Sequence, residues 1–365
     1  MNFHIVLLLF TGSLFFGSGK CHVVPPKALS IGRSAEECVI TVRTEKVEPQ
    51  PLYVEPRRSS FWPITDNGHL VVKHNEEIEF LCPGHFKYPF EDDKTVIAKC
   101  VDGRTFSVDG KHHDFTAFAC KTWPSYTARR TGRSCPGGEL LESGFSYEDR
   151  FFRLTEICFN PTEEATRYVY HTLEPGSDYY QQGMARVEFI TDGFFGGKDV
   201  NYLYTQKKQK ETISHILGFD AADFIMGAEQ RGTFLFVNTA PQWQRFNAGN
   251  WQRVEDSTRT MATKRKLNLE CYTGTYGVTT LANKHGEQTE IYLYDEGGHK
   301  QIPVPKLYFR VVIEPRERKG IVLIGVNNPH LTLEEIERDY IPVLCTGPQI
   351  GINSLHDGIN SLHDT

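Results

Sequence analysis

One stretch of the chain holds the residue types that magnesium-dependent phosphate chemistry needs. Asn247 lies in an Asn-Ala-Gly-Asn stretch directly before a predicted helix, and Glu255 and Arg259 follow on that helix. Magnesium keeps most of its waters and needs only one or two protein oxygens, so an amide oxygen and a nearby carboxylate are sufficient. An arginine beside them would neutralise the charge that builds up on a phosphate in the transition state. The spacing therefore predicts a site where hydrated Mg²⁺ meets a phosphate.

The residues around this stretch predict how the site is held. The run TFLFVN (233–238) is a candidate buried strand, and Pro241 with the Asn-Ala-Gly-Asn stretch ends it. We expect a helix from about Asn250 or Trp251 onward. Its core-facing stripe consists of residues at three- to four-residue spacing, Trp251, Val254, Thr258 and Met261. Glu255 and Arg259 are four residues apart, so they share a different face of that helix.

The larger segment that contains this stretch, residues 136–346, mixes strands and helices without regular alternation. Strand-like runs are RYVYHTL, ARVEFI, TFLFVN, QTEIYLY, KLYFRVVI and GIVLIGV, and helix-like runs are KKQKETISHILG, NWQRVEDSTRTMATKRK and TLEEIERDYI. The last run carries a capping box formed by Thr332 and Glu335. This pattern predicts an α+β fold, a mixed and largely antiparallel sheet with packed helices.

The first 135 residues predict a leader and a small module. Residues 1–19 form an uncharged apolar run that ends in small residues, which is typical of a secretory signal peptide. A membrane anchor is the alternative, but the run is shorter than the ~20 residues of a transmembrane helix. In residues 20–135 the runs VVKH, EIEFLC and TVIAKC alternate apolar and polar residues between turns. We therefore expect a β-rich module in a secreted, extracellular protein.

The positions of the cysteines predict where disulfide bonds form, and the net charge limits how the protein can bind phosphate. Seven of the nine cysteines lie before residue 159, which predicts disulfide bonds in the N-terminal part, with one cysteine left over. The net charge of −6 argues against a simple polycation that coats nucleic acid. Phosphate binding must then come from local basic patches. The end of the chain, residues 347–365, repeats GINSLHD in tandem, and we expect a flexible tail there.

The site stretch is similar to a known family. The run NTAPQWQRFNAGNWQRVEDSTR resembles the DNA/RNA non-specific endonucleases, the ββα-metal (His-Me finger) nucleases, and most of all their insect secreted, salivary branch. Further matches at DGFF (192–195), NYLYTQKKQ, PVPKLYFRVVI and VNNPH extend the resemblance over roughly 140–345. The resemblance implies that Asn247 is the direct metal ligand, that Glu255 holds a metal-bound water and that Arg259 contacts the phosphate. It also implies Mg²⁺ as cofactor and DNA and RNA as partners, bound without regard to sequence.

The chain departs from this family at the catalytic base. Active members carry an Arg-Gly-His motif upstream of the metal-binding Asn, and its His activates water. Counting back from Asn247 without gaps puts Leu217 in the place of that His, with Ile216 and His215 in the Gly and Arg places. In a second alignment ISHILG (213–218) is the preceding helix and the motif is deleted. Neither alignment supplies the base, whose contribution is typically about 10²–10⁴-fold.

His215 is the candidate substitute base, because it lies two residues from the expected place. A structural role for this His, within a helix, is the alternative. His330, in the VNNPH run, is interpreted as a turn residue, and Trp243 as either a core residue or a stacking platform.

Candidate nucleic-acid contacts are basic residues around the site stretch. Arg186 matches an active-site Arg of the family. The clusters are Lys207, Lys208 and Lys210, then Arg245 and Arg253, and then Lys264, Arg265 and Lys266. For each cluster the alternative is a solvated helix face.

Three functions remain open from the sequence. The first is a secreted protein that binds DNA and RNA without sequence preference and cleaves them weakly or not at all. The second is a working Mg²⁺-dependent endonuclease that uses His215 or a relocated base. The third is a repurposed salivary factor that binds a host protein. We expect no membrane partner, and the oligomeric state is left open.

Overall fold

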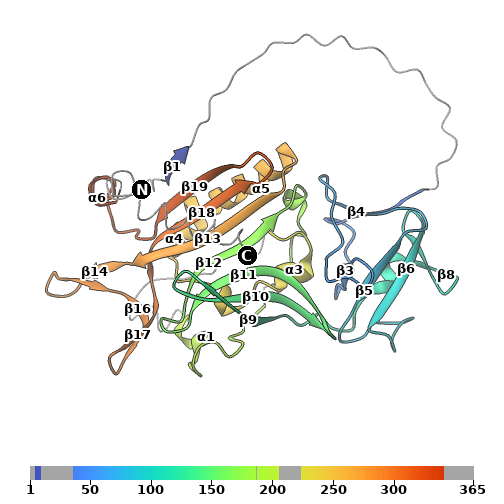
Figure 1. Ribbon diagram of the computed structural model, residues 1–365, viewed down its shortest axis with the longest axis horizontal. Coiled ribbons are helices and arrows are strands. Elements are labelled where there is room, and N and C mark those ends of the chain that lie inside the picture. The colour runs from blue at the N-terminus through green and yellow to red at the C-terminus, as the bar shows by residue number, and fades with distance from the viewer. Residues whose placement is uncertain (1–4, 10–35, 186, 205–222, 341–365) are drawn as a thin grey trace, which may run out of the picture.

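The larger of two main β-sheets carries the helix on which the predicted site lies (Figure 1). A computed structural model describes residues 5–9, 36–185, 187–204 and 223–340 of the chain. The pairings between neighbouring strands of these sheets are antiparallel, and short helices join and cover them. The predicted α+β fold is confirmed, with the β-rich module beside the larger sheet.

The N-terminal module consists of a five-stranded sheet and a two-stranded sheet. The two-stranded sheet pairs β2 (Cys38–Thr41) with β4 (His69–Val72). The five-stranded sheet has the order β3 (Leu52–Val54), β5 (Glu77–Leu81), β6 (Thr95–Asp102), β7 (Thr105–Val108) and β8 (Lys111–Asp114). The predicted runs VVKH, EIEFLC and TVIAKC form β4, β5 and β6. Phe80 stacks on Phe118 of η1 (Phe115–Phe118) in the module's core, with ring centroids 4.2 Å apart.

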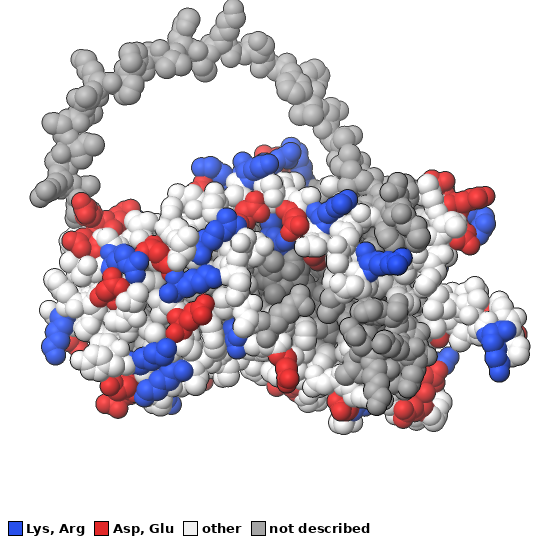
Figure 2. Space-filling view, turned by 180° about the vertical axis from the view of Figure 1, so that it is seen from behind, with Lys and Arg blue, Asp and Glu red and all other residues white. Residues whose placement is uncertain are grey.

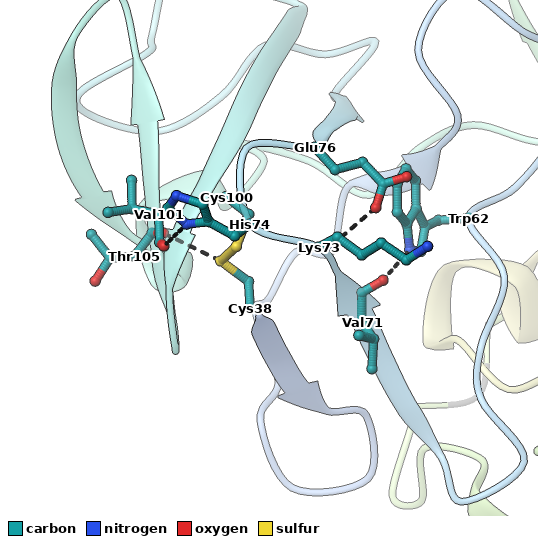
Figure 3. The surroundings of a disulfide bond; sticks show 9 residues. All are labelled: Cys38, Trp62, Val71, Lys73, His74, Glu76, Cys100, Val101 and Thr105. Carbon is teal, nitrogen blue, oxygen red and sulfur yellow. Dashed lines mark hydrogen bonds between the residues drawn. A yellow bond between two sulfur atoms is a disulfide. The ribbon is translucent and has the colours of Figure 1, made fainter. Parts of the chain in front are cut away.

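Disulfide bonds reinforce this module, as the cysteine distribution predicts. Cys38–Cys100 ties β2 to β6 (Figure 3), and Cys82–Cys120 links β5 to the end of the module. Beside the first bond the Trp62 indole donates to the Val71 carbonyl at 3.0 Å. Native disulfides typically stabilise a domain by about 2–4 kcal/mol each.

The remaining cysteines lie in the part of the chain that forms the larger sheet, or outside the described residues. Cys135–Cys158 joins β9 to β11. Cys271 is free and buried, and burial raises the pKa of its thiol to about 12, so it is not a nucleophile at neutral pH. Cys21 and Cys345 lie outside the described residues.

The larger sheet has eight strands in the order β1-β19-β18-β13-β12-β11-β10-β9. Their bounds are β1 (Ile5–Leu9), β9 (Thr127–Cys135), β10 (Gly138–Tyr147), β11 (Arg150–Asn160), β12 (Ala165–Leu173), β13 (Leu269–Val278), β18 (Pro305–Glu314) and β19 (Lys319–Val326). Because β9 belongs to this sheet, the division between the two sheets falls near residue 126. The predicted signal peptide contains β1, which pairs with β19; the rest of residues 1–19 lies outside the described part.

Two small hairpins and several short helices complete the fold. The hairpins pair β14 (Thr280–Ala282) with β15 (Gln288–Glu290) and β16 (Tyr292–Glu296) with β17 (His299–Pro303). The helices are η2 (Ser177–Tyr179), α1 (Val200–Leu203), α3 (Gly227–Arg231), η3 (Phe236–Asn238), α4 (Gln244–Phe246), η4 (Asn247–Trp251), α5 (Gln252–Arg265) and α6 (Leu333–Asp339). The capping box of Thr332 and Glu335 is present at the start of α6. No helix in the described part of the chain meets the length and apolarity that a membrane span requires.

Two predicted strands are wrong. In TFLFVN, residues 236–238 form the 3₁₀ helix η3, and Leu235 makes only an isolated bridge to Ile190. Among the described residues of ARVEFI, the bridge at Ile190 is likewise the only β pairing. Side chains compete for the backbone here, because the Asn238 amide donates to the Thr233 carbonyl at 3.0 Å. The apolar residues of the run are buried as predicted, but in a turn. The predicted helix KKQKETISHILG lies outside the described residues.

Candidate functional site

The site stretch folds as one kinked helical segment. α4 runs into η4, a π-helical turn broken at Gly249 (φ −113°, ψ −112°), and α5 continues from Gln252. Single π-turns inside helices are frequent at functional sites. The predicted core stripe is confirmed: Trp251, Val254 and Thr258 are buried and Met261 packs against the core. Figure 1 shows α5 against one face of the larger sheet.

Asn247 stands at the start of the π-helical turn and is half-buried. Its backbone N–H donates to the Trp243 carbonyl at 2.9 Å, which fixes its position. Its side-chain amide has no hydrogen bond within the described part of the chain. The amide oxygen is therefore available to a ligand.

Glu255 and Arg259 share a face of α5, as predicted, and that face is buried. Arg259 is only 3% exposed. Its Nη1 donates to Asp223 Oδ1 at 2.9 Å, and its Nη2 donates to Asp256 on the same helix. Carboxylates thus bind both terminal nitrogens of the guanidinium that is expected to contact a phosphate.

Asp223 is the centre of a buried ion cluster. Besides Arg259, it accepts from Arg310 Nη2 at 2.7 Å and lies 2.9 Å from His171 Nε2. Burial alone would raise its pKa, but Arg310, His171 and Arg259 outweigh burial and hold the pKa of the Asp223 carboxyl far below its usual range. Asp223 is therefore a permanent counter-ion for two arginines.

This cluster was not predicted from the sequence, although the sequence holds a signal for it. His171 on β12 and Arg310 on β18 are at positions of their strands that face α5. The apolar Val169 and Val312 are on the same face of these strands. A charged or titratable side chain at an inward position of an apolar strand requires a buried partner. This rule identifies both residues but does not name Asp223 as their partner.

A small polar cavity lies beside the cluster. It measures about 20 Å³ and is lined by His171, Asp223, Asn238, Glu255 and Arg310, among others. Arg310 Nε and Asn238 Oδ1 are buried there without a hydrogen-bond partner in the described part of the chain. A cavity of this size holds about one water molecule, the kind of partner that buried polar atoms without a protein hydrogen bond require.

The size of this cavity shows whether a hydrated magnesium ion fits beside Glu255. This space holds about one water molecule, whereas Mg²⁺ usually keeps several of its waters, so a hydrated ion does not fit into the space beside Glu255. Among the described residues, no three His, Cys, Asp or Glu side chains gather as a metal-binding group. The arrangement fits Mg²⁺ at Asn247 alone and does not fit an ion that shares its hydration shell with buried Glu255.

The N-terminal module positions Asp223. Ile225 and Met226, which follow it closely, lie in the core of that module. At the start of α3 the Ala228 N–H donates to Gln50 Oε1 at 3.0 Å and the Gly227 N–H donates to Gln181 Oε1 at 2.7 Å. The chain after Asp223 is thus held by a residue of the module, Gln50, as well as by the larger domain.

A pair of carboxyl groups at this junction makes stability depend on pH. Burial and the charge of Glu174 raise the pKa of Glu229 from 4.5 to about 8. Because the folded-state pKa is the higher one, the contribution to stability is fully present below about pH 4.5 and is lost as pH rises through about 8. We expect the thermal unfolding midpoint to fall between pH 5 and pH 9, and Glu229→Gln to flatten that fall. The exposed control Glu337→Gln should keep the wild-type slope; an unchanged slope in Glu229→Gln would contradict the assignment.

The other residues predicted for the site fall into three groups. Trp243 is a core residue, whose indole donates to the Asn327 carbonyl at 2.8 Å, and His330 is in a turn against it. The predicted nucleic-acid contacts on α4, on α5 and at the end of α5 are exposed and lie outside the ion cluster: Arg245, Arg253, Lys264, Arg265 and Lys266. Predictions outside the described residues concern Arg186, Lys207, Lys208, Lys210, His215, Ile216 and Leu217.

Comparison with known protein families shows to which family this chain belongs. The model of the DNA/RNA non-specific endonucleases matches residues 137–353, more than half of the chain. This chain belongs to that family. The match covers the larger sheet from β10 onward, together with α4, α5 and the ion cluster.

Individual relatives agree with this membership. A "salivary endonuclease" of Lutzomyia longipalpis is 27% identical over 330 residues, which are 84% of this chain and 74% of the relative. "Salivary protein Tsal1" of Glossina morsitans morsitans is 26% identical over 287 residues, 72% of this chain and 70% of the relative. Among solved structures, the crystal structure of an EndoG/EndoGI complex aligns with 16% identity and a TM-score of 0.36 over 50% of this chain and 74% of that one.

Proposed function

We propose that this member of the non-specific endonuclease family is a secreted protein that binds DNA and RNA without sequence preference and cleaves them weakly or not at all. The disulfide bonds and the salivary relatives support secretion. Family membership supports nucleic acid as the ligand.

The observation that carries the proposal is the closed state of the phosphate half of the site. Arg259 is buried and its guanidinium is bound by Asp223 and Asp256. Two arginines face three carboxylates there, counting Arg310 and Glu255, so the charge of these groups does not attract a phosphate. The neighbouring cavity has room for about one water. In this arrangement a phosphodiester would have to compete with Asp223 and Asp256 for the guanidinium of Arg259.

Binding then relies on exposed cations near the site stretch. Arg245, Arg253, Lys264 and Arg265 are accessible on α4 and α5, where they would neutralise backbone phosphates. Figure 2 shows basic and acidic side chains interspersed over the face opposite to that of Figure 1. This distribution agrees with the net charge of −6 and favours binding through local patches.

Magnesium has a limited place in the proposed function. Asn247 is the residue that would hold the ion, through its unbonded amide oxygen. A bound Mg²⁺ would polarise a phosphate oxygen and stabilise charge on it. The described residues fix the backbone of Asn247 through the Trp243 carbonyl and bury Glu255.

The proposed function predicts binding that persists without metal. A gel shift with plasmid DNA and with RNA should be present in EDTA and should weaken steeply as salt rises, since phosphate contacts release counter-ions. The combined variant Arg245→Gln/Arg253→Gln should weaken the shift, and the distant Lys284→Gln should not. If neither nucleic acid is shifted at low salt, the proposed function is wrong.

A second candidate function, a working endonuclease, is favoured by His171. This histidine lies 2.9 Å from Asp223 and lines the cavity that Glu255 also lines, an arrangement in which a carboxylate orients an imidazole. Rapid Mg²⁺-dependent degradation of plasmid and RNA, abolished by His171→Asn or by His215→Ala, would establish this function in place of binding alone.

A further inference from the structure

Three arginines converge on one face of the larger sheet, away from the site stretch. Arg129 and Arg133 come from the edge strand β9 and Arg153 from β11. All three approach Glu142 of β10: Arg129 Nη2 at 2.8 Å, Arg153 Nη1 at 3.6 Å and Arg133 Nη2 at 3.9 Å. We call these residues the arginine triad.

The triad is on the sheet face opposite to the cavity. Arg133 and Arg153 also bind Glu156 of β11, and Glu156 is paired in register with Tyr170 of β12. Their neighbours Thr155 and His171 line the cavity. Because successive side chains of a strand point to opposite faces, the triad and the buried ion cluster lie on the two sides of the sheet.

The cations of this surface are more accessible than its anions. The side chains of Arg129, Arg133 and Arg153 are 53%, 51% and 45% exposed, whereas those of Glu142 and Glu156 are 13% and 14% exposed. Three guanidinium groups stand over Glu142 and Glu156, so the sum of the charges of these five groups is positive. Each guanidinium has five N–H donors. The two carboxylates that the arginines share do not occupy all of these donors.

Aromatic rings flank the triad. The Arg129 guanidinium lies 3.8 Å above the ring of Phe151, which fixes its plane. Tyr168 and Tyr170 are half-buried on the same face, next to Glu156. Exposed guanidinium groups combined with aromatic rings are the surface on which single strands track their phosphates and stack their bases.

We propose that the arginine triad is a second nucleic-acid interface, which holds the phosphate backbone of single-stranded DNA or RNA on the sheet face of β9, β10 and β11. The partner is recognised by its regularly spaced phosphates and by base stacking, not by base identity. The inference rests on the proposed function and adds a surface to it that is independent of Asn247 and of metal.

The test is an anisotropy titration of a labelled oligothymidylate in EDTA at several salt concentrations. Arg129→Gln/Arg133→Gln/Arg153→Gln should weaken binding at least about tenfold and should reduce the salt slope by about 2, since each phosphate of a single strand that an arginine neutralises adds ~0.7 to that slope. The charge-matched control Arg316→Gln/Arg318→Gln/Lys319→Gln, on the exposed turn between β18 and β19, should bind as the wild type does.

A second variant, which is expected to strengthen binding, keeps the proposal testable if the triple arginine variant does not fold. Glu142→Gln/Glu156→Gln keeps the arginines and removes the anions beneath them, so it should bind at least about threefold more tightly, with a steeper salt slope. Wild-type binding that neither set of changes alters overturns the triad but leaves the proposed function in place. No wild-type binding in any salt overturns both.

Discussion

Replacing Asp223 by alanine is expected to cost about 3–5 kcal/mol of the free energy of unfolding, because it removes the buried carboxylate that two buried arginines share. Arg259 and Arg310 are 3% and 1% exposed, so water cannot take over the role of the carboxylate. The measurement is urea unfolding followed by tryptophan fluorescence.

The control for this change removes the other carboxylate that binds Arg259. Asp256 is 55% exposed, so Asp256→Ala should cost less than about 1 kcal/mol. If the two variants lose similar stability, the buried cluster is not the feature that holds α5 to β12 and β18.

Deleting residues 36–125, the N-terminal module, is expected to leave the part of the chain that contains the larger sheet unable to fold as a soluble monomer. The deletion uncovers Ile225 and Met226, which lie in the core of the N-terminal module, and removes Gln50 from the start of α3. The loop that delivers Asp223 then loses both its packing and its hydrogen-bond acceptor. Solubility, circular dichroism and the oligomeric state of the truncated chain measure the result.

A graded version of this prediction uses one residue. Gln50→Ala should cost about 1–3 kcal/mol, since it leaves the Ala228 N–H buried without an acceptor. Truncation of residues 347–365 is the matched control and should not change stability. A truncated family domain that folds cooperatively and keeps the stability of the full chain would contradict the assigned role of the module.

Periodicity predicted the elements whose packing follows from local pattern. The runs RYVYHTL, KLYFRVVI and GIVLIGV are β12, β18 and β19, and the helix stripe from Trp251 to Met261 faces the core. These segments have one apolar face and one dominant period, so local and tertiary preferences agree. TFLFVN was wrong because a continuous apolar run shows burial and does not distinguish a strand from a buried turn.

The site was predictable only in part. The Glu255 and Arg259 spacing placed both residues on one face of α5, because helical geometry alone determines that relation. Helical geometry does not state whether that face meets solvent or the sheet. That depends on Asp223, His171 and Arg310, which come from three other segments of the chain. The arginine triad was missed for a similar reason, since Arg153 joins Arg129 and Arg133 only through strand pairing.

We propose that the protein holds nucleic acid and cuts it weakly or not at all. The most direct measurement is to incubate the protein with an end-labelled single strand in Mg²⁺, record anisotropy through the incubation, and then determine the length of the recovered strand. We predict a high, stable anisotropy and a strand of unchanged length. Rapid and complete shortening of the strand, which EDTA prevents, would contradict the proposal and identify the protein as a working nuclease.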